Sequence, residues 1–185
     1  MTWECARLQI DTFLTVSEVE HQTLTFMGGE PFMAFPLIKE CVTYISIKYP
    51  QKHISYTIVT NGTLVHGEIQ KWIVEHEDNV QVVLSLDGLG VEHDLNRCNS
   101  LKNIDLDFFR GLKKPIVNSV FTPEAIDRMC QITTELHQQG FFVKGFIADG
   151  EQWKTEHIAI VAQQLMELVS FYLEHPTVSP MSLLN

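Results

Sequence analysis

The feature of this sequence that most constrains its fold is an alternation of two hydrophobic patterns. Short β-prone stretches that end in glycine or polar residues alternate five times with longer stretches in which apolar residues recur at helical spacing. This alternation predicts an α/β fold, a parallel sheet covered by its connecting helices and either open or curled into a barrel. In both arrangements the loops at the carboxyl ends of the strands carry the chemistry. The predicted strands are residues 23–27, 55–59, 80–86, 115–121 and 141–148.

Capping residues and prolines predict where the helices begin and end. Thr2 is an N-cap candidate for the first helix, and Pro36 suits the first turn of the second. Thr122-Pro123-Glu124 has the order of an N-cap, an N1 proline and an acidic first turn, and it predicts a helix that ends at Gly140. The predicted helices are residues 2–15, 35–49, 68–76, 105–112, 123–139 and 155–174, with a polar loop from residue 87 to about 103.

Length and charge limit the classes of protein that this chain can represent. Its 185 residues contain no repeat and no Ser/Gly linker, so residues 1–185 are predicted to form a single domain. With 13 basic and 23 acidic residues the formal net charge is −10, which disfavours nucleic acid as a partner. No apolar run approaches the roughly 20 residues of a membrane helix, and the N-terminus does not have the pattern of a secretion signal. These features predict a cytoplasmic protein without a membrane partner.

The four cysteines are scattered along the chain. Cys5, Cys41, Cys98 and Cys130 form no CxxC or CxxxC unit. A zinc or iron-sulfur site usually takes two or more ligands from one short loop, so this spacing argues against a local metal site. Disulfides are not expected in the cytoplasm.

The loops after the first two predicted strands have two interpretations each. In Gly28-Gly29-Glu30-Pro31 the glycines let the backbone approach a ligand, Glu30 can accept hydrogen bonds from an ammonium group, and Pro31 stiffens the exit. The alternative is an ordinary Gly-Gly turn with a solvated glutamate. In 60–63 (Thr-Asn-Gly-Thr), Asn-Gly is a common turn dipeptide, and the alternative is that Thr60 or Thr63 only caps the next helix.

The loop after the third strand is rich in polar side chains. Ser85 and Asp87 alternate along the strand end, so they are expected to point toward one pocket. Arg97 follows in the segment 92–97, and its planar guanidinium suits a bidentate pair with a carboxylate. The alternative is a surface loop with an internal Asp94–Arg97 ion pair.

Taken together, these ordered loops resemble the radical S-adenosylmethionine superfamily, in particular its peptide- and sulfatase-maturing (SPASM-type) branch. Similar members carry Gly-Gly-Glu-Pro, Thr-Asn-Gly-Thr-Leu, Ser-Leu-Asp-Gly and His-Asp-x-x-Arg segments, which here are residues 28–31, 60–64, 85–88 and 93–97. Residues 120–127 resemble the family's fifth strand and the start of the helix that follows it. The resemblance covers about residues 1–150.

The resemblance implies a partial (β/α)6 TIM-like barrel that binds S-adenosylmethionine. It implies that Gly28, Gly29 and Glu30 hold the methionine ammonium. Contacts to the ribose or the methionine carboxylate are implied for Ser85, Asp87 and Arg97, and Asn118 on the fourth predicted strand is a further candidate. The implied cofactor-binding set is Gly28, Gly29, Glu30, Pro31, Thr60, Asn61, Ser85, Asp87, Arg97 and Asn118.

In the family, three thiolates of a CxxxCxxC loop hold a 4Fe-4S cluster, and a 5′-deoxyadenosyl radical then modifies a peptide or protein substrate. This chain contains neither that loop nor the family's first strand, and Cys5 has no partner cysteine nearby. We therefore expect a core domain that is not catalytic alone, binds S-adenosylmethionine weakly, and has no metal ligands of its own. The unpaired edge of its first strand is expected to favour self-association or a partner chain.

Two other interpretations remain at this point. One is a non-catalytic binding or partner module derived from the same fold. The other is an unrelated α/β barrel hydrolase or phosphate-binding protein, although the sequence shows neither a nucleophile with its base nor a glycine-rich phosphate loop with a lysine.

Overall fold

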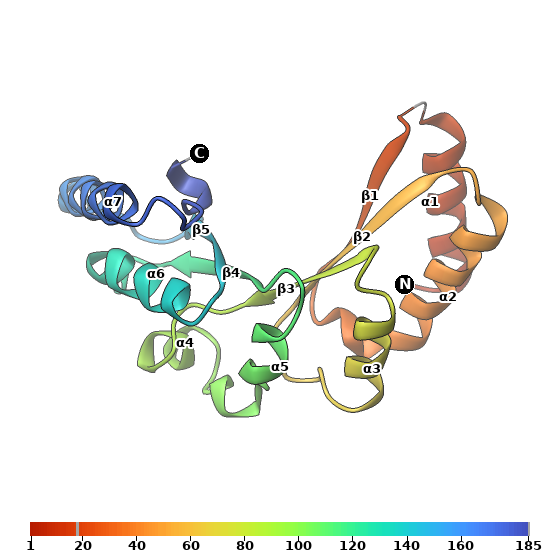
Figure 1. Cartoon of the computed structure of the whole chain (residues 1–185), viewed down its shortest axis with the longest axis horizontal. Coiled ribbons are helices and arrows are strands. Elements are labelled where there is room, and N and C mark those ends of the chain that lie inside the picture. Colours follow the sequence, from red (N-terminus) through yellow and green to blue (C-terminus); the bar gives the residue numbers. More distant parts are fainter. Residues whose placement is uncertain (18, 185) are drawn as a thin grey trace. The chain divides into compact units, whose positions relative to one another are not determined.

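The computed structural model describes residues 1–17 and 19–184 and shows the predicted alternation of helices and strands (Figure 1). Within these residues, no helix combines the length and apolar character needed to cross a bilayer. The elements are α1 (Trp3–Val16), β1 (His21–Phe26), η1 (Pro31–Ala34), α2 (Phe35–Lys48), β2 (His53–Thr60), α3 (Glu68–Glu75), β3 (Val80–Ser85), α4 (Val91–Asn96), η2 (Leu101–Asn103), α5 (Leu106–Arg110), β4 (Ile116–Phe121), η3 (Ile126–Arg128), α6 (Met129–Gln138), β5 (Phe142–Ile147), α7 (Thr155–Glu174) and η4 (Ser182–Leu184), where η marks a 3-10 helix.

The strands form one sheet in the order β1-β2-β3-β4-β5, so strands that are consecutive in sequence are neighbours in space. The registers are parallel: His21 pairs with His53, Ser85 with Asn118, and Asn118 with Lys144. Consecutive parallel strands joined by helices are the arrangement of (β/α) barrels. The predicted α/β fold of the partial TIM-barrel type is therefore confirmed. The chain divides into two compact units, residues 1–60 with 64–82 (unit 1) and residues 61–63 with 83–185 (unit 2).

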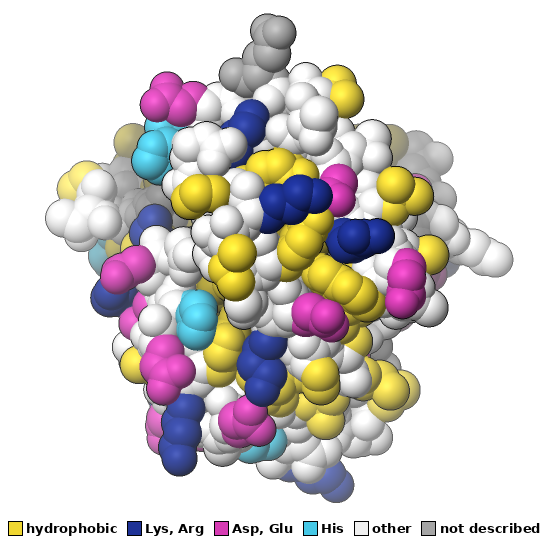
Figure 2. All heavy atoms as spheres, turned by 90° about the vertical axis from the view of Figure 1, so that its right-hand side faces the viewer, with side chains coloured by type: hydrophobic (Ala, Val, Ile, Leu, Met, Phe, Trp, Pro, Cys, Tyr) yellow, Lys and Arg dark blue, Asp and Glu magenta, His cyan; other side chains and the backbone are white. Residues whose placement is uncertain are grey.

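In unit 1, α1 and α2 each bury an apolar face. Thr2 caps α1 as predicted, because its hydroxyl accepts the Cys5 N–H at 3.4 Å. The opposite faces stay in solvent: Figure 2 shows hydrophobic side chains interspersed with charged side chains of both signs on the side where α1, α2 and α3 lie. The buried residues of the two helices are Ala6, Ile10, Leu14, Phe35, Ile38, Cys41, Val42 and Ile45.

In unit 2, one face of β4 and β5 is covered by α6 and the C-terminal segment. Val117, Ser119 and Phe121 alternate on the buried face of β4, while the residues between them are half-exposed. On β5 the buried positions are Val143 and Gly145, and Met181 fills the space beside Gly145. The face carrying Asn118 is therefore opposite to the one that the helices cover.

Two predictions about helices are wrong. The segment predicted to be a polar loop contains helix α4. Hydrophobic periodicity does not reveal this helix, because its polar residues Glu92 and His93 are buried while its apolar residues Val91 and Leu95 are exposed. The helix predicted to begin at Pro123, with Thr122 as its N-cap, instead begins at Met129. It follows a turn in which Ala125 donates its N–H to the Thr122 carbonyl at 3.1 Å, and then η3. Local turn geometry therefore replaces the expected cap.

Candidate functional site

The Gly28-Gly29 loop leaves an open stretch of backbone at the carboxyl end of β1. Both residues have positive φ, +97° at Gly28 and +53° at Gly29, a region that side chains rarely allow. A Cβ at either position would meet no atom within 4 Å in the described residues. The peptide groups here can thus be approached closely by a ligand.

Glu30 is held in place at the end of this loop. Its Oε1 accepts the Phe32 N–H at 3.1 Å, which caps η1, and the Thr60 hydroxyl donates to the same oxygen at 2.8 Å. Thr60 is the last residue of β2 and is almost fully buried, and Pro31 is the buried first residue of η1. The predicted residues Glu30 and Thr60 therefore meet in unit 1, and the interpretation of Glu30 as a merely solvated side chain is wrong.

Asn61 and Gly62 form a tight turn in unit 2. The Asn61 Oδ1 accepts both the N–H of Thr63 at 2.9 Å and its hydroxyl at 2.8 Å. Gly62 has φ +81°, and a Cβ there would lie 2.6 Å from the Leu84 Cδ1. Neither threonine caps α3, whose N-cap residue is Gly67. Asn61 thus fixes the shape of the chain after β2.

Asp87 and Arg97 form a bidentate pair in unit 2. The Arg97 Nε donates to Asp87 Oδ2 at 2.7 Å and its Nη2 donates to Oδ1 at 3.0 Å. Asp87 is only 3% exposed, and its Oδ1 also accepts the Val120 N–H at 2.9 Å. The alternative Asp94–Arg97 ion pair is wrong, since the Asp94 carboxylate accepts the Leu101 N–H at 3.1 Å instead.

His93 supports the same loop from within the core. Its Nδ1 accepts the Asp87 N–H at 3.3 Å, so its Nε2 is the nitrogen that donates to the Ser100 hydroxyl at 3.0 Å. Burial lowers the pKa of His93 below its ordinary value, which keeps the ring neutral and suits this hydrogen-bonding pattern. Sequence reasoning did not assign His93 a role of its own.

Ser85 and Asn118 are register partners on neighbouring strands, and Lys144 continues their row on β5. The Asn118 Oδ1 is buried and has no hydrogen-bond partner among residues 1–17 and 19–184. Such an atom is costly unless something donates to it. Lys144 was missed because its place beside Asn118 depends on strand register.

The described residues do not fit a 4Fe-4S cluster. Cys5 and Cys98 are exposed, Cys41 is buried and Cys130 is half-buried, and burial raises the pKa of the Cys41 thiol to about 11. In the part of the chain that the structure describes, no three His, Cys, Asp or Glu side chains gather as metal ligands. An iron-sulfur cube needs closely spaced thiolates, and these four do not supply them.

Comparisons with known proteins identify the family. The model of the 4Fe-4S single cluster domain matches residues 5–101, just over half of the chain. An uncharacterized protein of Methanocaldococcus jannaschii, MJ0907, is 32% identical over 112 residues, which cover 60% of this chain and 38% of that protein.

Solved structures share the fold. Native anSMEcpe with bound AdoMet matches 98% of this chain and 54% of its own at a TM-score of 0.82 and 19% identity. The same protein with bound AdoMet and the Cp18Cys peptide matches 97% of this chain and 55% of its own at a TM-score of 0.80 and 21% identity. The chain spans about half the length of these neighbours. The family match, together with this fold, identifies the chain as a member of the radical S-adenosylmethionine superfamily. The chain belongs to the family of 4Fe-4S single cluster domains within it.

Proposed function

We propose that this chain is the core domain of a radical S-adenosylmethionine enzyme whose parent activity is radical modification of a peptide or protein. The observation that carries the proposal is Glu30, whose carboxylate is oriented by Thr60 beside the open Gly28-Gly29 backbone. An ionised carboxylate accepts roughly four hydrogen bonds, so it can take N–H donors from the cofactor's ammonium group. Once bound, S-adenosylmethionine would supply the hydrogen-abstracting radical of this chemistry.

Unit 2 carries further polar side chains of the predicted cofactor-binding set. Ser85, the last residue of β3, has a hydroxyl that both donates and accepts, so it can hydrogen-bond a ribose hydroxyl or a carboxylate. Both carboxylate oxygens of Asp87 accept hydrogen bonds from Arg97, and Oδ1 also accepts the Val120 N–H. We therefore assign Asp87 to positioning Arg97. Asn61 is assigned to fixing the turn after β2, where its side chain accepts the Thr63 N–H.

The 185 residues alone are proposed not to be catalytic. Their four scattered cysteines do not provide three neighbouring thiolates, so electron delivery to the cofactor would need ligands from elsewhere. S-adenosylmethionine binding is consequently expected to be weak.

Calorimetric titration with S-adenosylmethionine and with methylthioadenosine, which has no amino-acid group, tests this proposal. Glu30→Gln should weaken S-adenosylmethionine binding about tenfold, because hydrogen bonds to a charged group contribute about 1.5–3 kcal/mol. Methylthioadenosine binding should not change. Glu68→Gln is the matched control, since Glu68 is an exposed glutamate of the same unit that pairs with Lys39. Equal S-adenosylmethionine affinity for the wild type and Glu30→Gln would refute the assignment.

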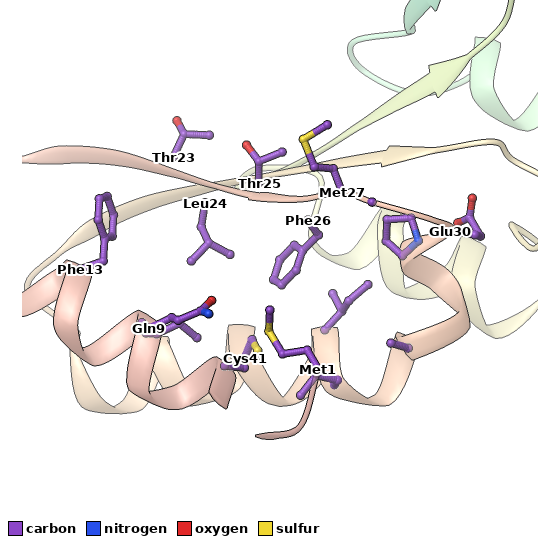
Figure 3. A pocket seen from close by; sticks show the side chains of 17 residues that line it. Met1, Gln9, Phe13, Thr23, Leu24, Thr25, Phe26, Met27, Glu30 and Cys41 are labelled. Carbon is purple, nitrogen blue, oxygen red and sulfur yellow. The ribbon is translucent and has the colours of Figure 1, made fainter. Parts of the chain in front are cut away.

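The open edge of β1 favours a second candidate function, a binding module. In the described residues β1 pairs with β2 alone, and a cavity of about 490 Å³ lies between β1 and helices α1 and α2. Figure 3 shows Leu24 and Phe26 pointing from β1 into this space, on the opposite side from Thr23 and Thr25. We propose that a strand of a second copy adds here, because an unpaired strand edge with apolar side chains beside it is a template for pairing.

Sedimentation equilibrium tests this second candidate. Phe13 is 47% exposed and lines the cavity, whereas Leu8 on the same helix is 68% exposed and does not line it. Phe13→Glu should shift a dimer to the monomer, and Leu8→Glu should leave it a dimer. A monomeric wild type at high concentration would point to a different chain as the partner.

A further inference from the structure

On the face of β4 and β5 that is opposite to the helices, the side chains form a strip of three rows that differ in chemistry. Ile116 is beside Phe142, Asn118 beside Lys144, and Val120 beside Phe146. These residues are half-exposed on β4 and exposed on β5, whereas the residues between them are buried. The strip thus has one polar row between two apolar rows.

Lys144 is the charged residue of this strip. Phe142 and Phe146 on either side of it are 48% and 45% exposed, so the strip presents an aromatic, a cation and an aromatic at two-residue spacing. The salt bridges of the described residues do not involve Lys144. In a chain of net charge −10, an exposed cation between two aromatic side chains is suited to an anionic group that also has apolar neighbours.

Asn118 gives a second, independent reason to expect a ligand on this strip. Its Oδ1 is buried beside Lys144 in register and has no hydrogen-bond donor among the described residues. A peptide N–H would satisfy this acceptor, since a buried acceptor without a donor costs about 1–3 kcal/mol. An extended peptide also places alternate side chains on one face at the same two-residue spacing as the strip.

We propose that this strip binds an extended peptide in which a carboxylate contacts Lys144, apolar side chains contact Phe142 and Phe146, and a backbone N–H donates to Asn118. This inference rests on the proposed function, because it takes a peptide as the substrate and adds that the recognised segment is acidic with apolar neighbours. Lys144 then determines specificity, and the Asn118 amide orients the peptide.

Three N-acetylated peptides, in which serines separate the residues meant to share one face, probe the strip by NMR titration of the full chain. Ac-Phe-Ser-Asp-Ser-Phe-NH2 carries a side-chain carboxylate, Ac-Phe-Ser-Asn-Ser-Phe-NH2 is its neutral counterpart, and Ac-Phe-Ser-Asn-Ser-Phe-OH carries only a terminal carboxylate. The aspartyl peptide should bind about fivefold more tightly than the neutral one, as expected for one charge-assisted contact at a partly exposed site. Amide signals of β4 and β5 should shift. A preference for the free terminus over the aspartyl peptide would identify the carboxylate as terminal, and still supports Lys144 as the anion site.

Lys144→Met should remove the preference for the charged peptide and leave the affinity for the neutral peptide within about twofold. Lys114→Met is the matched control, since Lys114 is exposed just before β4 and outside the strip, and it should retain the preference. Equal binding of the aspartyl and neutral peptides by the wild type, or a preference that survives Lys144→Met, overturns the inference. Because S-adenosylmethionine titration reports on Glu30 separately, the failure of either proposal is visible without the other.

Discussion

The hydroxyl of Thr60 donates to the Glu30 carboxylate at 2.8 Å, which links the end of β2 to the loop that follows β1. The loop after β1 and the end of β2, which are separated in sequence by α2, therefore meet at the Glu30 Oε1. The same oxygen caps η1 by accepting the Phe32 N–H. The orientation of the proposed ammonium acceptor is therefore held in part by Thr60.

Thr60→Val tests this dependence, because valine keeps the shape of threonine and removes the donor. We expect S-adenosylmethionine affinity to fall about fivefold, equivalent to about 1 kcal/mol for one hydrogen bond. Calorimetric titration measures the change. Thr43→Val on the exposed face of α2 is the control and should bind as the wild type does. If Thr60→Val bound equally well, Glu30 would be oriented by other contacts.

Gly62→Ala should destabilise unit 2 more than a comparable change elsewhere. Alanine there must adopt φ +81° and place its Cβ 2.6 Å from the Leu84 Cδ1. Overpacking adds about 1–3 kcal/mol to the roughly 1–2 kcal/mol cost of the left-handed conformation. Gly140→Ala is a matched control, because Gly140 lies in the same unit, has φ +88° and its Cβ would meet nothing within 4 Å. Urea unfolding should show the larger loss for Gly62→Ala, and equal losses would mean that the Leu84 side chain moves aside at no cost.

The sequence was informative where hydrophobic periodicity dominates. The five strands follow from short β-prone stretches bounded by glycine or polar residues, and the long helix α7 (Thr155–Glu174) follows from apolar residues at helical spacing. Helix α4 was missed because its buried residues are polar: Glu92 pairs with Arg128, and His93 binds the loop backbone and Ser100. Polar burial of this kind depends on partners far along the chain, which periodicity does not reveal.

The candidate site could be predicted only in part. The motifs identify the residues of each loop, but they do not identify the side chains with which these residues pair. The pairing of Arg97 with Asp87 instead of Asp94 requires the path of α4, and the position of Lys144 beside Asn118 requires the strand register. Both are tertiary facts, set by packing of segments that are distant in the sequence.

Met181→Ala should destabilise unit 2 by about 2–5 kcal/mol, as for other buried methionines. Met181 is fully buried, lies where a side chain on Gly145 would be, and donates its N–H to the Tyr172 hydroxyl at 2.9 Å. Its loss leaves a cavity against β5 and weakens the attachment of the C-terminal segment. Chemical denaturation measures the effect, and Met166→Ala, at a position that is 72% exposed on α7, should change stability by less than about 0.5 kcal/mol. A similar small effect for Met181→Ala would mean that this segment contributes little to the fold.

The contact between α1 and α2 should give unit 1 an acid-sensitive stability. Asp11 accepts hydrogen bonds from Lys48 at 2.9 Å and from the Tyr44 and Tyr49 hydroxyls at 2.7 Å each, and these donors, Lys48 first, lower the pKa of Asp11 from 3.8 to about 2. Because the folded pKa is below the unfolded one, the carboxylate stabilises the fold at pH values above about 4, and this contribution is lost as the pH falls toward 2.

Urea midpoints of the wild type and Asp11→Asn between pH 5 and pH 2 measure this contribution. The wild type should be the more stable protein at pH 5, and the difference should shrink steadily as the pH falls through this window. Tyr49→Phe removes one of the three donors and should show the same trend with a smaller amplitude. Parallel curves for the wild type and Asp11→Asn would show that the ionised carboxylate adds nothing to the packing of α1 on α2, because a contribution that depends on ionisation must change across the pKa that it shifts.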